Sequence, residues 1–121
     1  MRYPRGPLAA FGPDGTAWFR PVWAAATFGQ RFRGLMFTDP KPMALWFPGC
    51  RFVHSHWMRY VLDIIFLDSD GTVLRHAVLR PWSAASHPQA ASILEIPLGV
   101  ADMAKLPERL ILEAESPLRA G

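Results

Sequence analysis

The sequence predicts a mainly β domain of the α+β kind, with one or two short helices, and three observations support this. Twelve prolines among 121 residues are about twice the usual share of roughly 5%. Proline disrupts the interior of helices and of central strands, so the chain must contain many turns and strand ends. Short runs of aromatic and β-branched residues alternate with Gly, Pro and Asp, as strands and turns do. Only one stretch has a clear helical stripe.

The length of the chain fits one domain with a single core. Glycine and proline interrupt residues 1–16 repeatedly, so we predict an irregular leader there. Residues 17–115 form the predicted globular domain, and residues 116–121 form a C-terminal tail.

The first predicted elements of the domain are strands followed by a helix. Residues 17–27 are rich in Trp, Phe and Val and predict one or two strands, interrupted at Pro21. Thr27 and Gln30 have the spacing of a capping box, in which two side chains satisfy free amides at the start of a helix. The apolar residues that follow at helical spacing predict a short helix, which ends before Pro40.

The middle of the chain predicts four strands and a hairpin. Residues 43–47 and 51–58 are the first two strands. Residues 62–67 are apolar on both faces apart from one aspartate, which is typical of a central buried strand. The Asp-Ser-Asp-Gly segment at residues 68–71 predicts a hairpin turn, because Asp-Gly readily adopts positive φ. It leads into a strand over residues 72–79.

The last third of the chain predicts a loop, two strands and a helical turn. Residues 81–89 form the loop, and residues 92–96, which include Glu95, form a strand. A helical turn at residues 101–106 precedes a final strand at residues 110–113.

The charge pattern argues against a nucleic-acid partner. The net charge is +3, and the thirteen basic residues, all but two of them arginine, are scattered from Arg2 to Arg119. Nucleic-acid binders gather positive charge on one face or helix, so this pattern indicates a mildly basic solvated surface instead. No run approaches the ~18 apolar residues of a membrane span, so we expect no membrane partner.

Cysteine usage and the first residues bear on the location of the protein. A lone cysteine, Cys50, cannot form an internal disulfide, which is typical of a reducing compartment. The segment from Met1 to Pro7 lacks the apolar stretch of a signal peptide. We therefore expect a soluble protein of the cytoplasm.

Residues 50–58 contain the first candidate site. On a strand, alternate side chains share a face, which would bring Cys50, His54, His56 and Met58 together. Thiolate, imidazole and thioether groups are the ligands that soft metals such as Cu(I) prefer. The structural alternative is that Cys50 and Met58 are core residues and that the histidines hydrogen-bond to neighbours. Cys50 is disfavoured as a nucleophile, because His54 would lie ~13 Å away along the strand.

Asp63 is the second candidate, because a carboxylate in an apolar strand is costly to bury without a partner. Arg31, Arg59 or His54 would serve as that partner. The structural interpretation is that Asp63 ties a basic residue or a loop to the core. The chemical interpretation is that Asp63 and Glu95 form an acid–base pair.

Five segments in order resemble one family and occur at its spacings. The first, QRFRGLM, is similar to its E-R-x-x-G-L-M signature, and the second, VHSHWMRYVLDIIFLD, to V-H-T-x-x-M-x-x-P-[IL]-D-V-V-F-L-D. The five segments lie at residues 30–36, 53–68, 70–73, 80–82 and 93–99. The chain therefore resembles the family called domain of unknown function 192, an uncharacterised bacterial and archaeal group. The resemblance implies a compact, barrel-like β domain with a small helical element, and it implies no activity.

These observations lead to three hypotheses for function. We expect a small non-catalytic binding or accessory domain, because the sequence offers no cofactor loop and no assembled nucleophile, base and oxyanion set. No catalytic residue and no cofactor are therefore expected. The first alternative is a soft-metal protein that uses Cys50, His54, His56 and Met58, and the second is a hydrolase that uses Asp63 and Glu95. The candidate binding cleft consists of Arg31, His54, Met58, Asp63 and Glu95.

Overall fold

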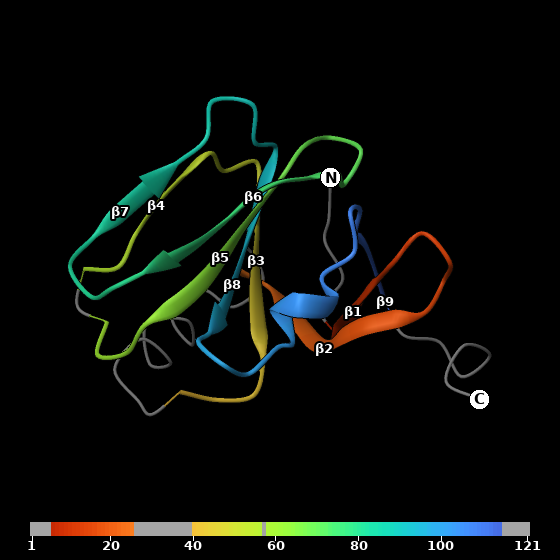
Figure 1. Cartoon of the computed structure of the whole chain (residues 1–121), viewed down its shortest axis with the longest axis horizontal. Helices are drawn as coiled ribbons and strands as arrows, with labels where there is room; N and C mark the ends of the chain where they lie inside the picture. The colour runs from red at the N-terminus through yellow and green to blue at the C-terminus, as the bar shows by residue number, and fades with distance from the viewer. Residues whose placement is uncertain (1–5, 26–39, 57, 115–121) are drawn as a thin grey trace.

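The computed structural model describes residues 6–25, 40–56 and 58–114 of the chain. Within these residues the protein is mainly β, as the sequence predicts (Figure 1). It has a seven-stranded mixed sheet, a two-stranded sheet and a 3-10 turn. None of the described helical segments is long and apolar enough to cross a membrane.

The large sheet has the strand order β6-β5-β8-β3-β2-β1-β9. Neighbouring strands are antiparallel except β2 and β3, which run parallel. The small sheet, at the left of Figure 1, is the antiparallel pair β4 and β7. The bounds are β1 (Leu8–Phe11), β2 (Ala17–Ala24), β3 (Ala44–Pro48), β4 (Phe52–His54), β5 (Leu62–Leu67), β6 (Val73–Leu79), β7 (Ala84–Ser86), β8 (Ser92–Pro97) and β9 (Ile111–Ala114).

The hairpin predicted at residues 68–71 joins β5 and β6. The Asp68 carboxylate accepts hydrogen bonds from the backbone N–H groups of Asp70 and Thr72, each at 2.9 Å. Gly71 has a φ of +84°, and its carbonyl accepts a hydrogen bond from the Leu110 N–H at 2.8 Å. A Cβ atom at Gly71 would overlap the Leu110 carbonyl oxygen. Both the backbone conformation and the close approach of the chain therefore require glycine here.

The large sheet is not a closed barrel, which corrects the barrel-like architecture that the resemblance implied. Its edge strands are β6 and β9, and the segments just before them form one isolated bridge, between Thr72 and Arg109, outside both strands. Beside that bridge the Val73 N–H donates to the Glu108 carbonyl at 2.9 Å. The described part of β9 has only four residues, and all of them pair with β1. The two edges of the sheet are therefore linked by backbone hydrogen bonds at one place and not by a continuous ladder of pairs.

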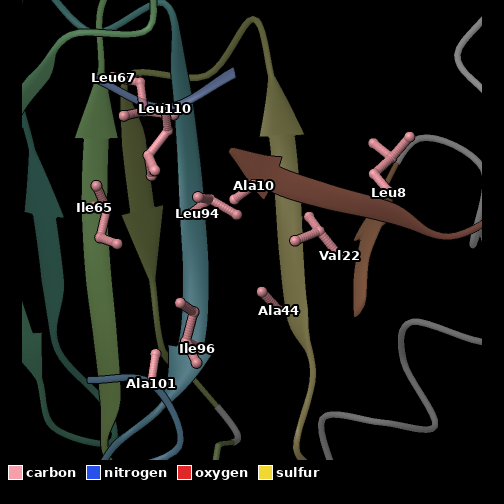
Figure 2. Packing of buried hydrophobic residues seen from close by; sticks show 10 residues of the cluster. All are labelled: Leu8, Ala10, Val22, Ala44, Ile65, Leu67, Leu94, Ile96, Ala101 and Leu110. Atoms are coloured by element: carbon pink, nitrogen blue, oxygen red, sulfur yellow. The ribbon is translucent and has the colours of Figure 1, made fainter. Parts of the chain in front are cut away.

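Each face of the large sheet carries a hydrophobic core. Side chains alternate along β5, so that Ile65 belongs to the first core and Ile64 to the second. The small sheet contributes Val53 and Ala85 to the second core. Both β5 and β8 are buried along their whole length, as expected for strands with a core on each face. Figure 2 shows the first core, which consists of Leu8, Ala10, Val22, Ala44, Ile65, Leu67, Leu94, Ile96, Ala101 and Leu110.

Three segments differ from their predicted conformations. Leu8–Phe11 was expected in the irregular leader but forms β1, whose four residues are buried between β2 and β9. Pairing with two neighbours satisfies the backbone of this strand, which overrides the local glycine and proline signal. The loop predicted at residues 81–89 contains β7, and β4 is shorter than the strand predicted at residues 51–58.

Other predictions concern the helices and Pro21. β2 passes through Pro21 without ending, although its register with β1 shifts nearby. The helical turn predicted at residues 101–106 is the 3-10 turn Met103–Lys105, where the Asp102 carboxylate accepts from the Ala104 N–H at 3.1 Å. The helix predicted from Thr27 and the predicted C-terminal tail lie outside the described residues.

Candidate functional site

An apolar pocket of about 180 Å³ lies on the face of the large sheet that carries the second core. Strands β3, β5 and β8 of the large sheet and β4 of the small sheet contribute to its walls. A cavity of about 150 Å³ holds a benzene molecule, so this volume suits a small ligand. The described residues that line the pocket are Lys41, Met43, Leu45, Phe47, Phe52, Val53, His54, Met58, Tyr60, Leu62, Glu95 and Pro97.

Glu95 is the buried polar residue of this pocket. Its side chain extends from β8, between Leu45 of β3 and Ile64 of β5, and the residue is 7% exposed. No cationic side chain among the described residues pairs with the Glu95 carboxylate. Burial raises the pKa of Glu95 from 4.5 to about 8, because a charged carboxylate is poorly solvated there. The pocket therefore contains a neutral carboxylic acid at pH 7.

Three further titratable residues line the pocket. Tyr60 is half-buried, and its pKa is raised by its own burial and, to a lesser extent, by the charge of Glu95. Lys41 and His54 are exposed and lie at the rim. The pocket thus has an acid in its interior and basic groups near its entrance.

An exposed row of aromatic rings extends from the rim of the pocket. Phe52 and His54 have ring centroids 6.2 Å apart, His54 and His56 4.6 Å, and His56 and Trp82 5.4 Å. Trp82 has a φ of +61°, which is unusual for a side chain of this size. The buried Ser55 holds this region together, because its carbonyl accepts from the Trp82 N–H and its hydroxyl bonds the backbone of residues 80 and 83.

Asp63 faces away from the pocket. Its Oδ1 lies 2.7 Å from Nε2 of His76, and the residue is only 2% exposed. His76 pairs across strands with Ile65, whereas Glu95 pairs with Ile64. Because neighbouring residues on β5 point to opposite faces, the two carboxyl groups lie on opposite sides of the sheet. They do not form the acid–base pair of the hydrolase hypothesis, and the partner of Asp63 is His76.

The five residues of the predicted cleft have different positions in the fold. His54, Met58 and Glu95 line the pocket, whereas Asp63 lies on the other face of the sheet. Arg31 lies outside the described residues. The structure therefore brings three of the five residues to one site.

The predicted metal-ligand set is also divided. The rings of His54 and His56 pack together, while Cys50 and Met58 pack against the second core. Among the residues that the structure describes, no group of three or more His, Cys, Asp or Glu side chains is placed to hold a metal ion.

Several pocket residues were not predicted from the sequence. Leu45 and Phe47 alternate along β3, and Met43, just before that strand, continues the same alternation, which places all three on one face. The pairing of Leu45 with Glu95 decides that this face is the wall of the pocket. That pairing joins strands far apart in the sequence, and no local signal specifies it. Tyr60, which lies between two strands, carries no pattern of its own.

Two solved structures share this fold. One is a crystal structure of a proposed transcription regulator from Sinorhizobium meliloti 1021, with a TM-score of 0.66 and 22% identity over 88% of this chain and 90% of that one. The other is a protein of unknown function from Novosphingobium aromaticivorans, with a TM-score of 0.62 and 23% identity over 88% of this chain and 83% of that one. At this level of identity the likeness supports the fold alone.

Archaeal proteins are similar to this chain in sequence. A UPF0127 protein of Thermococcus sibiricus is 38% identical over 95 residues, which are 73% of this chain and 62% of that protein. One of Pyrococcus abyssi is 32% identical over 74% of this chain and 81% of that protein. The chain thus spans less than two-thirds of the Thermococcus relative. The family model described as DUF192, uncharacterized ACR, matches residues 12–108. The chain belongs to the uncharacterised DUF192 (UPF0127) family.

Proposed function

We propose that this chain is a binding domain for a small molecule and that the ligand occupies the pocket beside Glu95. The observation that carries the proposal is a buried carboxyl group without a cationic partner among the described residues, placed in an otherwise apolar pocket. Binding sites are typically apolar concave surfaces with a few polar groups that orient the ligand. Met58 and His54 supply a soft apolar wall and a polar rim to the same pocket.

The energetic argument supports a ligand rather than a purely structural role for Glu95. Burying a carboxyl group costs free energy unless hydrogen bonds or a charge partner compensate for the lost water. Leu45 and Ile64 lie beside Glu95 on the neighbouring strands. Their side chains are apolar, so they form no hydrogen bond with its carboxyl group. A ligand that hydrogen-bonds to the carboxyl group while its apolar part fills the pocket would offset this cost.

A pocket-filling variant tests the proposal by native mass spectrometry of protein purified from cells. We expect an excess of mass on the wild-type protein that disappears on unfolding. Leu45→Trp should lose the excess because the indole fills the pocket, whereas Leu98→Trp, at a residue that is 53% exposed, should keep it. An equal excess on Leu45→Trp would contradict the proposal.

A weak ligand that dissociates during purification calls for a second measurement. We expect small amphipathic fragments to raise the thermal midpoint of the wild-type protein and of Leu98→Trp, but not that of Leu45→Trp. If no fragment distinguishes the variants and the native mass is that of the bare chain, the pocket is not a ligand site.

A further inference from the structure

The polar groups around the pocket limit the chemistry of its ligand. The interior carboxyl belongs to Glu95, and the other titratable residues at the pocket, among those that the structure describes, are Tyr60, which is half-buried, and Lys41 and His54, which are exposed. The neighbours of Glu95 on β3 and β5 are apolar. The described part of the chain thus supplies no positive charge to the interior of the pocket. A cationic ligand would provide the charge that pairs with this carboxyl group.

The rest of the wall is suited to a cation. Phe47, Phe52 and Tyr60 bring three aromatic rings to the pocket, and Met43 and Met58 bring two thioethers. The faces of aromatic rings carry negative potential and attract ammonium groups. Thioether sulfur is polarisable and adapts to irregular ligands. A carboxylate together with aromatic rings therefore offers a partly dehydrated ammonium ion both a counter-ion and a favourable wall.

The volume restricts the size of this ligand. A pocket of about 180 Å³ is only slightly larger than a cavity that holds benzene, which has six heavy atoms. A branched or cyclic alkyl group of this size, with one ammonium group, would fill it.

We propose that the pocket binds a small organic ammonium ion, whose charged group pairs with Glu95 and whose alkyl part contacts the aromatic and thioether wall. This inference rests on the proposed function and specifies its ligand class. Glu95 is a neutral acid in the empty pocket at pH 7, so its carboxyl proton passes to the solvent when the cation binds, and the bound pair is neutral overall. A neutral hydrogen-bonding ligand would leave the proton in place.

Three probes with one carbon framework test the charge requirement. They are 3-methylbutylammonium, 3-methylbutan-1-ol and 3-methylbutanoate, which are positive, neutral and negative at pH 7. In calorimetric titrations we expect the ammonium ion to bind at least about tenfold more tightly than the alcohol. The carboxylate should not bind. Equal or tighter binding of the alcohol or the carboxylate would overturn the inference.

Proton release gives a second readout. At pH 7 the binding enthalpy of the ammonium probe should differ between phosphate and HEPES, two buffers of different ionisation enthalpy that carry no primary ammonium group, corresponding to release of about one proton per ligand. In a pair of buffers effective at pH 9 and likewise free of primary ammonium groups, this dependence should vanish, since Glu95 is then ionised before binding. Binding at pH 7 without proton release would also contradict the inference.

Glu95→Gln is the matched variant, with Glu108→Gln, an exposed carboxylate, as its control. We expect Glu95→Gln to bind the ammonium probe and the alcohol equally, and Glu108→Gln to behave as wild type. If Glu95→Gln does not fold, the probe series and the buffer series on the wild-type protein still decide the question.

The outcomes separate this inference from the proposed function. If the alcohol binds as tightly as the ammonium ion or more tightly, and Leu45→Trp abolishes its binding, the pocket is a ligand site and only the ammonium assignment fails. If none of the three probes binds and the native mass shows no ligand, both proposals fail.

Discussion

At the scale of single residues, Glu95 couples the stability of the protein to pH. The folded protein holds the carboxyl proton up to a pKa of about 8, whereas the unfolded chain releases it near 4.5. Between these values the unfolded state binds fewer protons, so the free energy of unfolding falls as pH rises. Above pH 8 the carboxyl group is ionised in both states, and this contribution no longer changes.

We expect Glu95→Gln to remove this dependence. The slope due to one such group is about 1.4 kcal/mol per pH unit at most. Urea unfolding of the wild-type protein and the variant at pH 5, 6, 7 and 8 measures it, and Glu108→Gln controls for the loss of one charge. Parallel stability curves for wild type and Glu95→Gln would show that Glu95 ionises normally in the folded protein.

The pair Asp63 and His76 stabilises the other face of the sheet. We expect His76→Ala to lower the free energy of unfolding by about 1–3 kcal/mol, because it leaves the buried Asp63 carboxylate without this hydrogen bond. Adding Asp63→Asn should cost less in the His76→Ala background than in wild type, since the two residues are coupled. Urea unfolding of the four proteins gives the coupling.

A surface histidine provides the control for this cycle. His56 lies in the exposed aromatic row, and His56→Ala should change the free energy of unfolding by no more than about 0.5 kcal/mol. Additive effects of Asp63→Asn and His76→Ala would contradict the coupling.

At the scale of elements, the Gly71 turn links the β5–β6 hairpin to the start of β9. Gly71→Ala brings a Cβ atom into overlap with the Leu110 carbonyl oxygen at a positive φ. We expect it to lower the free energy of unfolding by about 2–4 kcal/mol, through backbone strain and displacement of the Leu110 segment.

Gly99→Ala separates the two causes. Gly99 has a φ of +83°, but a Cβ atom there meets nothing within 4 Å. The cost at Gly99 should therefore be only about 1 kcal/mol, from the backbone conformation alone. Urea unfolding compares the two variants, and equal losses would mean that the contact with Leu110 is unimportant.

The elements that the sequence predicts well are those that local signals define. The hairpin at residues 68–71 was confirmed because Asp-Gly and the flanking apolar runs lie next to each other in the chain. β1 was missed because its four residues stand between glycines and prolines, and only pairing with β2 and β9 makes them a strand. β7 was missed in the same way, since its partner is the distant β4.

At the scale of the whole molecule, the order of the strands could not be read from the sequence. For the same reason, the sequence alone does not specify which of the candidate residues share one face of the sheet. The sequence predicts His54, Met58 and Glu95 as cleft residues because each is a polar or soft side chain in an apolar context. Asp63 met the same criterion, but it points to the other face of the sheet. Only the register of β5 with its two neighbours separates it from Glu95.

The pairing of β1 with β9 brings Phe11 beside Ile111, at opposite ends of the described chain. Bringing these two residues together closes a long loop, which costs chain entropy before the β1–β9 pairing can form. The β5–β6 hairpin closes locally and has a smaller cost. We expect amides of β5, β6 and β8 to become protected first during refolding, and those of β9 last, as pulsed hydrogen exchange would measure. Simultaneous protection would contradict this order. During synthesis, the edge of β1 that pairs with β9 would then stay unpaired until the residues of β9 had been added.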